Sequence, residues 1–385
     1  MKKILFGIDQ FCVEGSKNRD LRYSLVTNDV ARNVFGLKSR VALLNAGFQI
    51  VKLFSPEHGL SATNADGAWV PNQTDGLTNL PVISLYGDKL SPSSEDLRDV
   101  DAVIFDIPDV GCRFYTYVWT MTHIMDACAA NNKKFIVLDR PNPLSGDVLK
   151  AEGPLLDDAC TSFLGRWNIP IRHSCTLGEL ARYFASSHIT NLDLEVVKME
   201  NWNRNDFPEE DNWKFIPTSP AIKDIYTALL YPGLGLLEGI NVNEGRGTEL
   251  DFKVFAAPLI HSATLKTNLD SLNLPGVSFS TTKYIPTWGM YQDETCYGLT
   301  LQVTNKQQIK PVNLGIEILK ELITNYPVEC KERLYKTNAN PNGDGHLDKL
   351  LGIQNSFEKL KNKVKIQTQI QDNPWHDKIL PYLIY

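Results

Sequence analysis

Short apolar segments alternate with helix-like segments through the first 150 residues, and this alternation limits the possible folds more than any other feature of the chain. The segments that predict strands are 22–27, 49–54, 81–86, 102–107 and 134–138. The segments that predict helices, from apolar spacing or start signals, are 30–46, 91–100 and 117–131. Strands rich in Val, Ile and Leu that alternate with helices are typical of a parallel sheet covered on both faces. The sequence therefore predicts an α/β fold with a Rossmann-like, doubly wound, mostly parallel sheet.

The alternation loosens after about residue 155, where irregular stretches such as 201–220 become long. Helices are predicted at 176–186 and 313–325, and strands near 194–198 and 297–303. A length of 385 residues suggests two or three domains. We expect a Rossmann-like domain over residues 1–155, a smaller α+β domain over residues 156–385, and an active-site cleft between them.

Charge and composition exclude several functional classes. The chain has 39 Lys and Arg against 45 Asp and Glu, a formal net charge of −6, so binding to nucleic acid or a membrane surface is not expected. No apolar stretch approaches the roughly 18 residues of a transmembrane helix. Seven scattered cysteines favour a reduced compartment. The sequence as written thus predicts a cytoplasmic protein, although a periplasmic or secreted protein whose signal peptide had been removed would look the same.

Polar side chains gather at the ends of three predicted strands. Glu57 and His58 follow the second strand, and another group surrounds the end of the fourth: Asp106, Asp109, Arg113, Tyr115 and Tyr117. A third group, Asp139, Arg140 and Asn142, follows the fifth strand. Ligands of open α/β sheets bind beyond the carboxyl ends of the strands. Three such loops favour a site at this edge over the alternative that these residues only form turns and helix caps.

A fourth polar cluster lies at residues 238–248, where Glu238, Asn241, Glu244 and Arg246 stand among small residues. Its glycines allow a close approach of the backbone to a ligand, which favours a binding loop. The alternative is an ordinary turn with solvated charges.

Several common motifs are absent or weak. The sequence contains no Walker A, GxSxG, HExxH or CxxC motif, so ATP hydrolysis, an α/β-hydrolase triad and a zinc site are not expected. The glycines of 233–239 have the wrong spacing for a dinucleotide loop. We interpret His173 as structural and residues 344–346 as a surface loop. No cofactor and no metal are predicted.

Six motifs occur in a fixed order along the chain: FSPEHGL (54–60), FDIPDVGCRFYTY (105–117), VLDRPNPLSG (137–146), EGPLL (152–156), RHSCTLGEL (172–180) and LLYPGLGLLEGINVNEGRGT (229–248). Together they resemble the exo-β-N-acetylmuramidase family, the NamZ-like proteins of glycoside hydrolase family 171, over about residues 20–385. The resemblance implies a bacterial hydrolase of cell wall recycling with a cleft between a Rossmann-like domain and a smaller domain. Its activity would be that of an exo-acting glycosidase that releases N-acetylmuramic acid from the non-reducing ends of peptidoglycan fragments.

A glycosidase needs two carboxyl groups beside the scissile bond. We expect Glu57 and Glu244 to be this pair, with His58 as a further catalytic residue and with four carboxylates in reserve: Asp106, Asp109, Glu152 and Glu238. The pair should meet across the cleft, about 5–5.5 Å apart for retention of configuration or about 6.5–9.5 Å apart for inversion.

N-acetylmuramic acid carries a lactyl carboxylate, which an arginine can bind through its planar fork. The candidates are Arg113, Arg140 and Arg246, and Tyr115 and Tyr117 could stack on the sugar ring. The remaining residues expected to bind the peptidoglycan-derived saccharide are Asp106, Asp109, Asp139, Asn142, Glu238 and Asn241. Two alternatives are a non-catalytic peptidoglycan-fragment-binding protein and another small-molecule enzyme that uses the same strand-end cleft.

Overall fold

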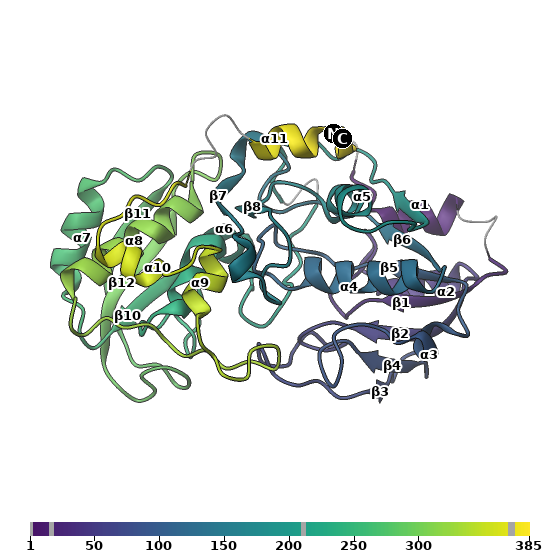
Figure 1. The fold of residues 1–385 in the computed structure, drawn as a ribbon, viewed down its shortest axis with the longest axis horizontal. Coiled ribbons are helices and arrows are strands. Elements are labelled where there is room, and N and C mark those ends of the chain that lie inside the picture. The colour runs from purple at the N-terminus through teal and green to yellow at the C-terminus, as the bar shows by residue number, and fades with distance from the viewer. Residues whose placement is uncertain (1–2, 15–18, 209–212, 369–373) are drawn as a thin grey trace.

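The structure is a computed structural model that describes residues 3–14, 19–208, 213–368 and 374–385, arranged as two domains along the long axis (Figure 1). A seven-stranded sheet with the order β3-β4-β2-β1-β5-β6-β9 forms the first domain. Its strands are β1 (Arg22–Val26), β2 (Gln49–Ser55), β3 (Gln73–Thr74), β4 (Pro81–Ser84), β5 (Ala102–Phe105), β6 (Lys134–Leu138) and β9 (Leu194–Val197). Within the described residues, β3 pairs antiparallel with β4 and the other pairings in this sheet are parallel. The predicted mostly parallel sheet is confirmed.

Helices cover both faces of this sheet. On one face, α1 (Gly7–Glu14) and α2 (Ser39–Asn45) share a hydrophobic core with alternate strand residues such as Leu25 and Ile104. On the other face, α4 (Tyr117–Ala130) and α5 (Leu177–Ser187) pack on strand residues such as Val103. Because successive strand side chains point to opposite faces, fully apolar strands can fill both cores at once.

Two predicted helices are much shorter than expected. The segment 30–46 becomes helical only at Ser39, because the Asn33 side chain accepts hydrogen bonds from the backbone N–H groups of Phe35 and Leu37 and so holds a turn. The segment 91–100 contains only α3 (Ser94–Leu97), which begins at a capping box.

The first domain extends beyond residue 155, where we placed its end. Strand β9 lies parallel to β6, with Phe135 opposite Leu194, and so belongs to the same sheet. The segment between these strands includes a two-stranded sheet, β7 (Glu152–Leu155) with β8 (Pro170–Arg172), as well as α5. Because the segment after β6 begins with irregular structure, the sequence did not show that the strand–helix alternation continues to β9.

The second domain contains the antiparallel sheet β10-β12-β11, built from β10 (Val254–Ala257), β11 (Val277–Tyr284) and β12 (Cys296–Val303). Its helices are α6 (Ile225–Leu234), α7 (Ser262–Ser271), α8 (Pro311–Asn325), α9 (His346–Leu351) and α10 (Ser356–Lys361). Helices α6 and α8 touch at Gly233 and Gly315, where a Cβ on Gly233 would lie 2.1 Å from the Pro311 carbonyl oxygen. The expected smaller α+β domain is thus present. No helix in the described residues is long and apolar enough to cross a membrane.

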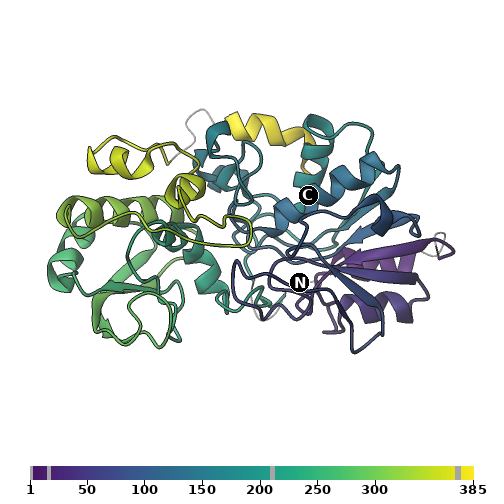
Figure 2. The same cartoon turned by 60° about the horizontal axis from the view of Figure 1, so that its bottom comes forward.

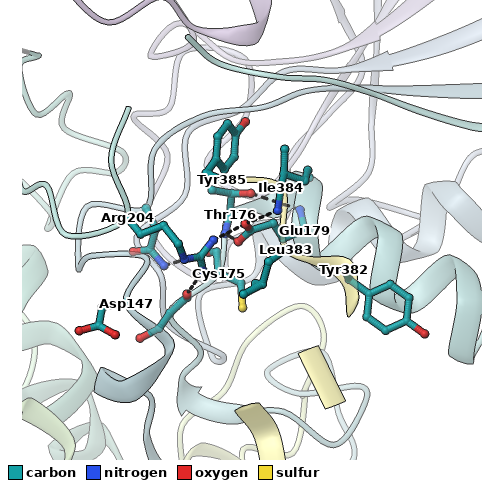
Figure 3. A network of polar contacts seen from close by, with 12 residues as sticks. Asp147, Cys175, Thr176, Glu179, Arg204, Tyr382, Leu383, Ile384 and Tyr385 are labelled. Atoms are coloured by element: carbon teal, nitrogen blue, oxygen red, sulfur yellow. Dashed lines mark hydrogen bonds and ion pairs between the residues drawn. The ribbon is translucent and has the colours of Figure 1, made fainter. Parts of the chain in front are cut away.

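The end of the chain returns to the first domain through α11 (Pro374–Ile379), as Figures 1 and 2 show. Figure 3 shows the polar network that holds it: the backbone N–H of Ile384 donates to Glu179, which is also paired with Arg204. The Tyr385 hydroxyl donates to Asp139 over 2.7 Å. Asp139 and Glu179 are both fully buried. Burial, and then the neighbouring Glu179, raise the pKa of Asp139 to about 6.

This raised pKa predicts a pH-dependent difference between the wild-type protein and the Asp139→Asn variant. A carboxyl whose pKa is higher in the folded state stabilises the fold fully below its unfolded value of 3.8, and this contribution is lost as pH rises through about 6. The variant should therefore gain stability relative to wild type between pH 4 and pH 7, by at most about 3 kcal/mol. Urea unfolding at four pH values in this range measures the difference, and parallel stability curves for the two proteins would contradict the prediction.

Candidate functional site

A cavity of about 780 Å³ lies between the two domains. The first domain lines it with the loop after β2, which carries Glu57, and with the loop after β5, which carries Tyr115 and Thr116. The second domain contributes segments 238–252 and 335–350. Residues distant in the sequence therefore line one cavity.

Glu57 is held on the cavity wall with both carboxylate oxygens engaged. One oxygen accepts a hydrogen bond of 2.6 Å from the backbone N–H of Gly67, and the other accepts one of 2.5 Å from the Thr116 hydroxyl. Thr116 is the N-cap residue of α4, so the loops after β2 and β5 meet at this carboxylate. Gly67 has a positive φ, and a Cβ there would lie 2.6 Å from the Thr337 side chain. These contacts leave Glu57 7 % exposed and fixed in direction.

His58 lies next to Glu57 on the same wall, in the left-handed backbone region at φ 66°. Its ring Nδ1 is 2.7 Å from the carbonyl oxygen of Asn64. Because a carbonyl only accepts, Nδ1 carries a proton, and Nε2 of the neutral ring is free to accept one.

Arg246 joins three carboxylates at the opposite wall. Its Nη1 is 2.8 Å from Asp66 of the first domain, its Nη2 is 2.7 Å from Glu238, and its Nε is 2.9 Å from Glu244. Arg246 and Glu238 both line the cavity, as does Asp66. The two terminal nitrogens donate hydrogen bonds to Asp66 and Glu238, and Nε lies beside Glu244, so three carboxylates share one guanidinium.

Glu244 does not line the cavity, although we predicted it as the second catalytic carboxylate. It is 1 % exposed, and its remaining charged neighbour is Arg333 at 3.5 Å. Burial raises the pKa of Glu244 against the attraction of Arg246 and Arg333. The residues of this glycine-rich turn that line the cavity are Arg246, Gly247 and Thr248, and the expected pairing of Glu57 with Glu244 stays a prediction.

Glu238, which we held as a reserve carboxylate, lines the cavity. Burial acts to raise the pKa of this carboxyl, but Arg246 and His346 more than offset burial and bring the pKa well below its usual value. Glu238 is therefore a carboxylate at neutral pH.

His346 is buried on the cavity wall, which corrects our interpretation of residues 344–346 as surface. Asp344 and Gly345 are exposed as expected, whereas His346 is 3 % exposed. The His346 ring stacks on Tyr335 at 4.4 Å, and its Nε2 is 4.0 Å from Glu238. Tyr335 in turn donates a hydrogen bond to Asp66. This aromatic contact was not visible in a segment rich in Asn and Gly.

The other predicted arginines are structural. Arg113 is fully buried and donates to the backbone carbonyls of Pro154, Ile169 and Leu350, and burial lowers its pKa to about 10. Arg140 forms a buried ion pair with Asp106. Neither arginine lines the cavity, so both differ from our expectation of a ligand-binding role.

Most of the remaining predicted residues also serve the fold. Asp109 accepts a hydrogen bond from the Gly111 N–H and lies 3.6 Å from the fully buried His173. Tyr115 lines the cavity, whereas Tyr117 donates to the Thr218 carbonyl and does not. The side chains of four others make hydrogen bonds to the backbone. Asp139 and Glu152 accept from the N–H groups of Gly178 and Asn313. Asn142 accepts from the N–H of Leu144 and donates to the carbonyl of Cys175, while Asn241 accepts from the N–H of Lys331 and donates to the carbonyl of Glu329. These residues do not lie on the cavity wall.

The cavity also contains residues that the sequence reasoning missed: Asp66, Tyr86, Thr116, Lys223, Asp251, Trp288, Tyr335, His346 and Lys349. Most lie in loops far from the predicted strand ends, so their positions follow from long-range packing. Thr116 is the exception, because it precedes a predicted helix and could have been found as its cap. Among the described residues, no group of three His, Cys, Asp or Glu side chains is placed to hold a metal ion.

Comparisons with known proteins agree over the whole chain. The family model for the N-terminal part of exo-β-N-acetylmuramidase NamZ matches residues 23–226, and the model for its C-terminal part matches residues 229–385. The peptidoglycan β-N-acetylmuramidase NamZ of Bacillus subtilis (strain 168) is 38 % identical over 371 residues, which is 96 % of this chain and 87 % of that protein. Two crystal structures of DUF1343 family proteins from Bacteroides fragilis NCTC 9343 cover all of this chain and 99 % of their own. One has a TM-score of 0.85 at 29 % identity, and the other 0.73 at 25 %.

Removal of the Arg246 side chain should strongly destabilise the protein, because Asp66, Glu238 and Glu244 would lose their shared cation. We expect Arg246→Ala to lower the free energy of unfolding by about 3–5 kcal/mol, as for other broken buried ion pairs. Lys223→Ala is the matched control, since Lys223 pairs with Asp251 but is 42 % exposed and should matter by less than about 1 kcal/mol. Equal losses in the two variants, measured by urea unfolding, would show that the cluster does not stabilise the interface.

Proposed function

This chain belongs to the exo-β-N-acetylmuramidase NamZ family, and we propose that it is a glycosidase that releases N-acetylmuramic acid from the non-reducing end of peptidoglycan fragments. The observation that supports this activity best is one cavity with a carboxylate from each domain, Glu57 and Glu238, in its walls. Its volume is in the range of pockets that bind small molecules, and glycoside hydrolysis requires two carboxyl groups in one site.

Glu238 supplies the permanent negative charge in this proposal. Arg246 and His346 keep it ionised despite its burial, so it can stabilise the positive charge that develops on the sugar ring in the oxocarbenium-like transition state. Its direction is fixed by the 2.7 Å contact with Arg246. A carboxylate that is already ionised and oriented needs little reorganisation during the reaction.

Glu57 supplies the proton transfer. Its partner Thr116 has a hydroxyl that can rotate, so it can donate to the carboxylate or accept from the carboxylic acid. The site can therefore hold Glu57 in either protonation state, which an acid that later acts as a base requires. His58, whose Nδ1 donates to the Asn64 carbonyl, lies beside it on the cavity wall.

The test is release of the chromophore from a chromogenic glycoside of N-acetylmuramic acid. The wild-type protein should hydrolyse it, whereas Glu57→Gln and Glu238→Gln should each lose at least about 100-fold in turnover, the usual range for acid, base and electrostatic roles. Binding of the glycoside without release by the wild-type protein would contradict the enzymatic function.

Glu244→Gln is the matched control, because it removes the same charge from the same cluster at a position outside the cavity wall. It should remain folded and lose less than about tenfold in turnover. A loss of turnover as large as that of Glu238→Gln, with stability intact, would show that Glu244 is one of the two catalytic carboxylates, as the sequence analysis predicted.

A further inference from the structure

The substrate of the proposed reaction carries a negative charge, and the described cavity residues offer few groups to receive it. The three side-chain cations on the wall are Lys223, Arg246 and Lys349. Arg246 is already paired with Asp66, Glu238 and Glu244, so three nearby carboxylates offset its single positive charge. The cavity is acidic apart from these cations, because Glu57, Asp66, Glu238, Glu249 and Asp251 also line it.

Lys223 is already paired. Its ammonium lies 2.7 Å from Asp251, a carboxylate that is only 7 % exposed, and 3.8 Å from Glu249. Lys223 itself is 42 % exposed, so water screens its remaining charge.

Lys349 is the cation whose charge is least compensated. Its ammonium donates one hydrogen bond of 2.7 Å, to the backbone carbonyl of Asp344. The Asp344 carboxylate is 3.9 Å away and 72 % exposed, so it neutralises little of the charge. An ammonium has three donors, and the Lys349 side chain is 23 % exposed, so water screens its remaining charge only in part.

Lys349 lies on the same short helix as a residue that contacts Glu238. Lys349 and His346 are three residues apart on α9, so their side chains lie on the same face of the helix, and both line the cavity. His346 Nε2 is 4.0 Å from Glu238. Both ring nitrogens of His346 lack a hydrogen-bond partner although the side chain is 3 % exposed. A buried polar group without a partner is costly, which indicates that this wall is completed by a polar ligand.

We propose that Lys349 binds the lactyl carboxylate of N-acetylmuramic acid and so distinguishes this sugar from N-acetylglucosamine. The inference rests on the proposed function, since it assigns a specificity group to the same cavity. The lactyl group is on the same sugar ring as the anomeric carbon, at which the bond is cleaved. Lys349 is one helical turn from His346, which contacts Glu238, so its cation is suitably placed. It replaces the role that we expected for Arg113, Arg140 or Arg246.

The experiment compares two chromogenic substrates, the glycoside of N-acetylmuramic acid and the same glycoside with the lactyl acid converted to its neutral amide. Lys349→Met keeps the apolar stem and removes the charge. It should raise KM for the acid by roughly 10- to 100-fold, the range of one charge-assisted hydrogen bond, and change KM for the amide by less than about threefold. Normal turnover of the amide also shows that the variant is folded. Lys349→Arg should restore part of the preference for the acid.

Lys223→Met is the matched control, with the same substitution at the other cavity lysine. It should affect acid and amide equally. An unchanged ratio of acid to amide in Lys349→Met, or a loss confined to the acid in Lys223→Met, would overturn the assignment to Lys349 while leaving the proposed activity intact.

A wild-type protein that hydrolyses neither substrate would contradict the proposed function instead. The binding of free N-acetylmuramic acid and of its lactyl amide, measured by calorimetry, then decides the role of Lys349 separately. Wild type should bind the acid more tightly, and Lys349→Met should bind both alike. Equal binding of the two ligands by the wild-type protein would overturn the inference.

Discussion

One guanidinium, that of Arg246, connects the two domains and organises the cavity between them. It carries one positive charge and contacts three carboxylates, of which Asp66 belongs to the first domain and Glu238 and Glu244 to the second. Without it, three like charges would stand together in a largely buried place, which is strongly unfavourable. The same contacts fix the direction of Glu238 and keep it ionised. Domain association and the electrostatics of the site therefore have a common origin.

The sequence predicted those parts of the structure that depend on local patterns. Apolar runs located the strands of the main sheet, and the end of β2 located Glu57 and His58, because a strand end follows directly from where the run stops. The Asp66–Arg246 contact joins residues 180 positions apart, and no local pattern indicates such a pairing. Arg113 and Arg246 look alike in sequence, yet one meets backbone carbonyls and the other carboxylates. Only the packing of distant segments separates a structural arginine from one in the site.

The two domains contribute different chemistry to the cavity. In our proposal the first domain provides the group that transfers the proton, Glu57, on a rigid loop at the end of a parallel strand. The second domain provides the fixed negative charge of Glu238 and the cation of Lys349, on segments joined by His346. A substrate must contact both domains at once to react.

The return of the chain to the first domain limits how the cavity can open. The second domain begins near α6, and Ile384 and Tyr385, beyond α11, are bonded to Glu179 and Asp139 of the first domain. The second domain is therefore attached to the first at both of its ends. It can rotate about the line through these two attachments but cannot rotate freely in other directions. Asp66 and Arg246 belong to different domains, so a movement that separates the domains at this point also breaks their ion pair.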